Sequence, residues 1–260
     1  FTGAELENLI NLSGIFTINN KAQEMNLSVV TEARDRILMG ISRKFVTDMN
    51  KRRFMTAVHE VGHTYACYKN PLCKPRILKV TVVPSGPALG VTQTLELDDT
   101  VENKEYYLSF VDMAMGGHTA EECIFGKDNV TAGCSSDLSK ATQIAKKMIY
   151  EMSMYGEEIG YIYYDKGSEI KEEKLGEKHK IILNNKVDQI LAESHERVKS
   201  LINDNMDDVI KLSRALYKYN TLDANEIEYV LNDKLDLIKR TEYRDDYSEE
   251  NADKRCIIYT

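Results

Sequence analysis

The chain has 260 residues, of which 42% are apolar and 29% charged, and its formal net charge is −8 at pH 7. This length buries one good hydrophobic core, and the acidic balance without a long basic run argues against nucleic acid as a partner. The five cysteines form no paired framework, so they indicate free thiols in a reducing compartment.

No membrane span or signal peptide is recognisable in the chain. The longest apolar run, residues 77–84, is interrupted by Lys79 and Thr81 and is far shorter than the ~20 residues that a span requires. Because the chain opens at Phe1 rather than at Met, we expect a soluble fragment of a longer protein, with any membrane or targeting elements upstream.

Two short helices are predicted within the first forty residues. Thr2 and Glu5 form the pattern of a capping box, and an apolar repeat follows as far as Leu12. A second helix is predicted to begin at Ser28 and to end at Gly40.

The most informative segment is HEVGH, residues 59–63, in a helix predicted from about residue 50 to residue 68. It matches H-E-x-x-H, a pattern that places two imidazoles one helical turn apart, so that both can bind one small cation. Zinc lowers the pKa of its bound water to about 7, and Glu60 is placed to take that proton. We therefore predict His59 and His63 as zinc ligands and Glu60 as the catalytic residue.

The alternative for this segment is a pair of helical histidines that pack in a core or face solvent. The flanking residues 56–58 and 64–66 continue a fairly apolar helix on both sides of the motif. Neutral imidazoles in such a helix need polar partners, and a metal ion supplies them. The context therefore favours the zinc interpretation.

Residues 76–96 change from helical to strand-like patterning. The β-branched run 77–83, bounded by Pro75 and Pro84, predicts one strand. A turn follows, and residues 90–95 predict a second short strand. We expect a small β-sheet in a mainly α-helical protein.

After about residue 103 the pattern is helical. A helix predicted over residues 103–125 contains Gly116 and Gly117, which cost of order 1 kcal/mol each against Ala but permit a neighbour to approach closely. The remaining helices are predicted over residues 137–155, over residues 178–219 as a packed pair, and after a capping box at Asp223 and Glu226.

A catalytic zinc ion usually takes three protein ligands and one water, so a third ligand must lie elsewhere in the chain. Cys67 continues the helical face of His59 and His63. However, about 12 Å along the helix separates Cys67 from His59, too far for one shared ion, so we interpret it as a core thiol. His118 is a second candidate, although a lone helical histidine is more often a surface or core residue.

Acidic residues supply the other candidates for the third ligand. Glu121 and Glu122 lie on the predicted helix over residues 103–125. Asp137 follows a loop of small residues and begins a helix, where the positive helix terminus keeps a carboxylate ionised. The alternative for Asp137 is a simple N-cap, and spacing alone does not decide between it and the glutamate pair.

Six motifs occur in order along the chain: FTGAEL at residue 1, DRILMG at 35, ALGVTQ at 88, MGGHTAEECIFG at 115, TAGCSSDL at 131 and TLD at 221. Together they resemble the peptidase region of the FtsH family, the membrane-anchored AAA proteases of bacteria, mitochondria and plastids. One departure is His118, which stands where the family pattern has an arginine.

The resemblance implies that Asp137 is the third zinc ligand, because the aspartate of the corresponding family motif binds zinc with the two histidines. Glu121 and Glu122 then become helix residues or groups that orient a histidine N–H. The implied fold is a helical zinc metallopeptidase domain with a small β-sheet next to the active-site helix. The strand residues Gly90, Val91, Thr92, Gln93 and Thr94 would form the edge beside the zinc and pair with an extended substrate.

The resemblance also implies a domain organisation. Residues 1–39 would end an AAA lid and its linker helix, residues 40–241 would form the zinc peptidase domain, and residues 242–260 would form a charged, disordered tail. Gly40 would be the flexible joint to the missing motor. No G-x-x-x-x-G-K-[ST] motif is present, so ATP hydrolysis would belong to that motor.

The full-length protein is accordingly expected to be a hexameric, ATP-dependent protease with Zn²⁺ as its cofactor. Its substrates would be unfolded or membrane proteins, as in protein quality control, and it would contact a membrane only through an upstream segment. We expect an organellar inner membrane, mitochondrial rather than plastid, or a bacterial inner membrane.

Two other functions are compatible with parts of this pattern. A pseudo-protease scaffold would keep the fold without turnover, but the intact His59, Glu60, His63 and Asp137 argue against it. An unrelated zincin would use Glu121 or Glu122 as its ligand, and the order of the motifs argues against that.

Overall fold

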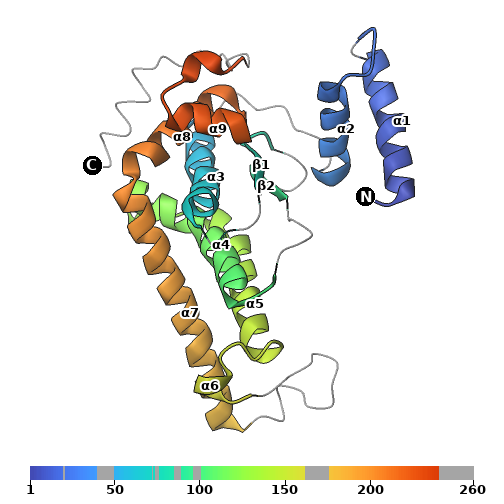
Figure 1. Ribbon diagram of the computed structural model, residues 1–260. Helices are drawn as coiled ribbons and strands as arrows, with labels where there is room; N and C mark the ends of the chain where they lie inside the picture. Colours follow the sequence, from blue (N-terminus) through green and yellow to red (C-terminus); the bar gives the residue numbers. More distant parts are fainter. Residues whose placement is uncertain are drawn as a thin grey trace. The chain divides into compact units, whose positions relative to one another are not determined.

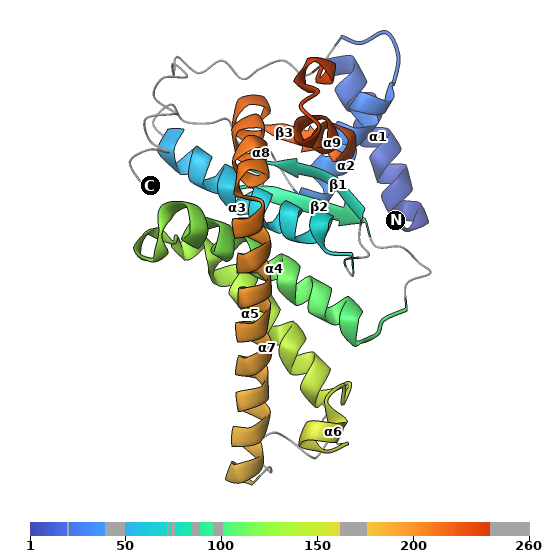
Figure 2. The same ribbon diagram turned by 60° about the vertical axis from the view of Figure 1, so that its left-hand side comes forward.

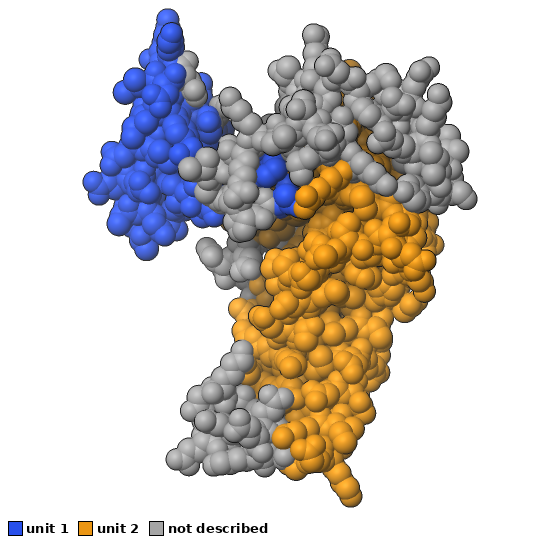
Figure 3. Space-filling view, turned by 180° about the vertical axis from the view of Figure 1, so that it is seen from behind, with its two compact units in different colours: residues 1–49, 83–90 blue, residues 50–82, 91–260 orange. Residues whose placement is uncertain are grey.

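The computed structural model describes residues 1–19, 21–39, 50–71, 73, 76–84, 89–95, 101–161 and 176–239. These residues are mainly α-helical and include a small antiparallel sheet, as predicted (Figure 1). The chain divides into two compact units, one of residues 1–49 with 83–90 and one of residues 50–82 with 91–260 (Figure 3). Gly40 and the predicted tail 242–260 lie outside the described residues. Among the described helices, none is long and apolar enough to cross a membrane.

The first unit contains α1 (Gly3–Asn19) and α2 (Leu27–Met39). The predicted capping box begins α1, because the backbone N–H of Thr2 donates to Glu5 Oε2 over 2.6 Å and that of Glu5 donates to Thr2 Oγ1 over 3.3 Å. Both predicted helices are therefore confirmed.

Helices α3 (Asn50–Lys69) and α4 (Lys104–Phe125) form the centre of the second unit. They cross where two glycines face each other. A Cβ on Gly62 would lie 2.3 Å from the carbonyl oxygen of Gly116, and a Cβ on Gly116 would lie 2.4 Å from that of Gly62. Only glycine fits this crossing without displacing backbone, which explains why α4 tolerates a residue of poor helix propensity there.

The sheet has β1 (Arg76–Thr81) in the middle, between β2 (Val91–Leu95) and β3 (Thr221–Asp223), with both pairs antiparallel. Thr81 pairs with Val91 on one side and with Thr221 on the other. The sheet lies beside α3 (Figure 2). The sequence pattern predicted β1 and β2 but missed β3, because three residues are too few to show an alternating pattern.

The other helices cover the central pair. They are α5 (Ser135–Tyr150), α6 (Gly156–Ile159), α7 (Glu177–Asp204), α8 (Met206–Tyr219) and α9 (Ala224–Leu231). The long α7 lies beside α4 and α5 in Figure 1 and passes in front of them in Figure 2. Its buried side chains recur every three or four residues, at Leu183, Val187, Ile190, Ser194, Val198 and Ile202.

Two predicted helix boundaries in this unit can be compared with the structure. The capping box at Asp223 and Glu226 is present at the start of α9. The helix predicted over residues 137–155 is shorter than expected, because α5 ends at Tyr150 and the chain turns before α6 begins. Ser153, in this turn, has a positive φ of 49° that ends the helical path.

Candidate active site

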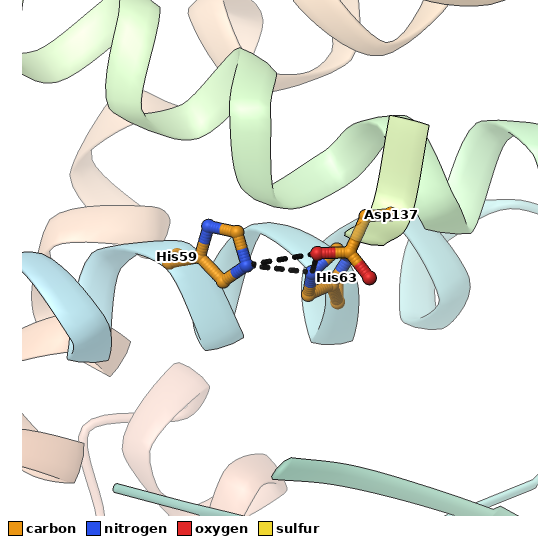
Figure 4. A group of neighbouring side chains, drawn as sticks. All are labelled: His59, His63 and Asp137. Atoms are coloured by element: carbon orange, nitrogen blue, oxygen red, sulfur yellow. Dashed lines mark hydrogen bonds and ion pairs between the residues drawn. The ribbon is translucent and has the colours of Figure 1, made fainter. Parts of the chain in front are cut away.

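Three side chains from two helices converge on one point in the second unit (Figure 4). His59 and His63 project from α3, and Asp137 lies in the first turn of α5. The Nε2 atoms of the two histidines are 3.1 Å apart, and Asp137 Oδ2 is 3.2 Å from His59 Nε2 and 3.4 Å from His63 Nε2. The structure therefore brings together the histidine pair and one of the acidic residues considered as third ligand.

The outer nitrogen of each imidazole is held by an acceptor on α4. His59 Nδ1 lies 2.8 Å from Glu121 Oε1, and His63 Nδ1 lies 2.7 Å from the backbone oxygen of Met113. We assign the Nδ1–H tautomer to both rings, because a carboxylate and a carbonyl can only accept. The backbone N–H of Gly117 also lies 3.3 Å from His63 Nδ1, but the contact with the Met113 oxygen is shorter by 0.6 Å and sets the tautomer. Both Nε2 lone pairs then point to the shared position, as metal-binding histidines require.

Glu121 is itself fixed in place. It is buried, and its carboxylate accepts hydrogen bonds from the backbone N–H and the hydroxyl of Thr131, over 2.6 Å and 3.1 Å. Burial opposes its ionisation, but the hydrogen bonds from His59 and Thr131 hold the pKa of Glu121 below its ordinary value. An ionised Glu121 orients His59, which is the orienting role that the resemblance implied for one of the two glutamates.

The charges of the site favour a cation. Burial acts against imidazolium, but hydrogen bonds to Asp137, Cys134 and Glu121 raise the pKa of His59 to about 12. Burial likewise acts against an ionised Asp137, but the hydrogen bonds that His59 and His63 donate to it when they are protonated, with the charges of His63 and Lys140, hold the pKa of its carboxyl well below its usual range. The group therefore stabilises positive charge at its centre.

The ligand atoms also have the spacing of a zinc site. Tetrahedral bonds of about 2.0–2.1 Å place neighbouring ligand atoms roughly 3.3 Å apart. The observed separations between His59, His63 and Asp137 are 3.1, 3.2 and 3.4 Å. Two imidazoles and a carboxylate are also a donor set of catalytic zinc, so the residues present fit this ion.

A second possible ligand set surrounds the other nitrogen of His59. Glu121 Oε1 and Cys134 Sγ lie 2.8 Å and 3.7 Å from His59 Nδ1. A metal there would leave His63 unused. The set around Asp137 uses both histidines of the motif, and we therefore favour it.

Glu60 is buried beside this group and belongs to no ligand set in the described residues. The hydroxyl of Thr92 in β2 lies 3.0 Å from Glu60 Oε2, and burial raises the pKa of Glu60 above its ordinary value. A carboxylate with a raised pKa next to a metal site is suited to accept a proton near neutral pH. The sequence indicated this role for Glu60, but it did not reveal Thr92 as its partner.

The remaining candidates lie elsewhere. Cys67 is buried and interacts with Cys73 rather than with the histidine pair, in agreement with its interpretation as a core thiol. His118 and Glu122 face His195 of α7 in a separate cluster. Residues Val91 to Thr94 lie in β2, as predicted, and Gly90 immediately precedes that strand.

A convergent pair of histidines and an aspartate, beside a buried glutamate and a short strand, is the arrangement of a zincin-type metallopeptidase. Comparison with known proteins defines the group further. Residues 45–230 match peptidase family M41. The chain belongs to this family.

Named relatives lie in animals, fungi and bacteria. The mouse "ATP-dependent zinc metalloprotease YME1L1" is 37% identical over 236 residues, 90% of this chain and 32% of the mouse protein. The yeast "Mitochondrial inner membrane i-AAA protease supercomplex subunit YME1" is 36% identical over 92% of this chain and 31% of its own length. "ATP-dependent zinc metalloprotease FtsH" of Rickettsia typhi is 32% identical over 89% of this chain and 37% of its own length. The chain thus spans about a third of the length of these relatives.

Proposed function

We propose that this chain is the zinc-dependent endopeptidase part of a longer, membrane-anchored, ATP-dependent protease. The observation that carries the proposal is the convergence of His59, His63 and Asp137 at separations of 3.1 to 3.4 Å. The names of the relatives support zinc as the metal and peptide bonds as the substrate.

His59 and His63 on α3 and Asp137 on α5 would hold the ion, which supplies a Lewis acid and makes a water acidic near neutral pH. Glu121 and the Met113 carbonyl keep the two imidazoles oriented and their Nε2 atoms free of protons. Glu60 accepts the proton of the attacking water and delivers it to the leaving amine.

Substrate binding is assigned to β2. In the described part of the sheet, β2 pairs only with β1, so its other edge is available to an extended peptide. Pairing at residues 91–94 would use backbone hydrogen bonds and tolerate many sequences, which suits a protease that degrades unfolded chains. Thr92 belongs to this strand and contacts Glu60, so the bound peptide would lie next to the general base.

The assembly is also part of the proposal. Residues 1–39 would end an AAA lid, residues 40–241 would form the peptidase domain, and Gly40 would join them. A hexameric ring would enclose the peptidase sites. The full-length protein would be anchored in an organellar inner membrane, mitochondrial rather than plastid, or in a bacterial inner membrane. Light scattering at micromolar concentration tests the ring, and a monomer in both this chain and the full-length protein would contradict it.

The activity is tested with Glu60→Gln, which keeps the proposed zinc ligands and removes the base. We expect unchanged zinc content and a loss of casein cleavage by roughly 10²–10⁴-fold. Glu157→Gln, at an exposed position of α6, is the matched control and should cleave like the unmodified chain. If Glu60→Gln cleaves at the unmodified rate, or if the unmodified chain and its full-length protein both fail to cleave, the proposal is wrong.

A further inference from the structure

A second cluster of metal-binding side chains lies outside the candidate active site. It consists of His118 and Glu122 on α4 and His195 on α7, and one ligand atom from each lies within 4.8 Å of the others. We propose that these three residues bind a second divalent transition-metal ion, with zinc as the ion that the donor set favours. None of them contributes to the peptidase chemistry described above.

The backbone places these side chains for a shared ligand. His118 and Glu122 are four residues apart on α4, so they occupy the same helical face. His195 comes from α7, which runs beside α4 (Figure 1), and its Nε2 lies 2.8 Å from Glu122 Oε2. The two imidazole rings face each other edge to face, with 5.9 Å between their centres.

The donor types select the class of ion. Two imidazoles and one carboxylate suit Zn²⁺, Co²⁺ or Ni²⁺ rather than Mg²⁺ or Ca²⁺, which prefer oxygen ligands. The side chain of His195 is 21% exposed and that of Glu122 is 9% exposed. Glu122 is therefore buried, and His195 is partly accessible to solvent, which leaves a route for an ion to reach the cluster.

Hydrogen bonding at the cluster is incomplete without an ion. His118 Nδ1 is buried and has no hydrogen-bond partner within the described residues, and a buried polar atom of this kind is costly unless a ligand engages it.

Two lysines of the described residues, Lys199 and Lys127, lie near this cluster. Lys199 Nζ lies 3.1 Å from Glu122 Oε1, and Lys127 Nζ lies 4.0 Å from the same oxygen. Both lysines use Oε1, whereas His195 lies against Oε2. Oε2 is therefore the carboxylate oxygen that would bind an ion between the two histidines, in place of its hydrogen bond with His195.

The sequence resemblance implies an arginine at position 118, where this chain has a histidine. An arginine there would place a fixed positive charge beside Glu122 and could not bind a cation. A second ion would instead cross-link α4 to α7. Because Glu121, which orients His59, is the neighbour of Glu122, this cross-link would also hold the part of α4 that supports the active site.

The test is metal stoichiometry. The metal-free 260-residue chain is loaded with ZnCl₂, passed through a desalting column and analysed for zinc by mass spectrometry. We expect two zinc ions per unmodified chain and one in each of His195→Ala and His118→Arg. The second variant introduces the arginine of the family pattern, so the test survives if the alanine variant fails to fold. Asp137→Ala should lose the other ion and keep this one, which separates the two sites.

His179→Ala removes another histidine of α7 and is the matched control, expected to keep two ions. The melting temperature gives an independent measurement. A second equivalent of zinc should raise it in the unmodified chain and leave it unchanged in folded His118→Arg. One zinc ion in the unmodified chain, or two in His118→Arg and His195→Ala, would overturn the proposal.

Discussion

The hydroxyl of Thr92 lies 3.0 Å from Glu60 Oε2, which joins the strand assigned to substrate binding directly to the proposed general base. The same oxygen of Thr92 lies 3.1 Å from the backbone oxygen of Glu60 and 3.3 Å from Thr64 Oγ1. The position of β2 and the protonation of Glu60 are therefore coupled through one side chain.

Replacing Thr92 should change the pH dependence of cleavage. A hydrogen bond donated to an ionised carboxylate lowers its pKa, so Thr92→Val should raise the pKa of Glu60 further above its ordinary value. Glu60 then takes up a proton at a higher pH, so the acid limb of the kcat/KM profile should shift to higher pH by roughly one unit. Activity on the alkaline side of that limb should be nearly retained.

The control for this prediction is Thr56→Val, the same chemical change on α3, where the hydroxyl bonds to the backbone of Arg52. Its acid limb should stay in place. If the limb of Thr92→Val also stays in place, or moves to lower pH, the hydroxyl does not stabilise the Glu60 carboxylate.

Gly117 should be irreplaceable because it lies against both imidazoles. A Cβ at this position would be 2.5 Å from His59 Cε1 and 2.6 Å from His63 Nε2. We expect Gly117→Ala to displace the rings, abolish peptidase activity and cost about 1–3 kcal/mol in urea unfolding, because of overpacking. Gly14→Ala in α1, where a Cβ would meet no atom within 4 Å, should keep full activity. A fully active Gly117→Ala would show that the positions of the two imidazoles do not depend on the absence of a side chain at residue 117.

Glu121 should matter through His59 rather than as a ligand. Glu121→Gln removes the charge that holds His59 Nδ1–H, and we expect the catalytic metal affinity to fall by roughly 10–100-fold. The measurement is the free zinc concentration that restores half of the cleavage activity of the metal-free chain. Excess zinc should restore most activity.

Glu105→Gln, in the first turn of the same helix, is the matched control, because its side chain is exposed and it belongs to neither proposed metal site. It should need the same zinc concentration as the unmodified chain. If Glu121→Gln were inactive at every zinc concentration, Glu121 would have a role beyond orienting His59.

The sequence predicted those parts of the site that depend on local geometry. The i, i+4 spacing of His59 and His63 is sufficient to place both rings on one face of α3, and the position of Asp137 at a helix start follows from the small-residue loop before it. Spacing did not choose between Asp137 and Glu121, because that choice depends on how α4 and α5 pack against α3. The resemblance favoured Asp137 as the ligand. The packing of the helices then placed Asp137 at the Nε2 side of His59 and Glu121 at its Nδ1 side.

The contacts that sequence reasoning missed are all long-range. Thr92 meets Glu60 because β2 lies alongside α3, and Glu121 meets His59 because two glycines let α4 cross α3 closely. Gly116 and Gly117, adjacent in the sequence of α4, were the one local signal of that crossing. β3 left no signal, since its three residues pair only after the chain has returned from α8.

The central claim is that His59, His63 and Asp137 hold the catalytic zinc. Its most direct test is an anomalous difference map from crystals of the zinc-loaded chain, collected at the zinc absorption edge. We predict a peak about 2.0–2.2 Å from His59 Nε2, His63 Nε2 and a carboxylate oxygen of Asp137. A peak between His59 Nδ1, Glu121 and Cys134, too far from Asp137 to be bound by it, would contradict the account.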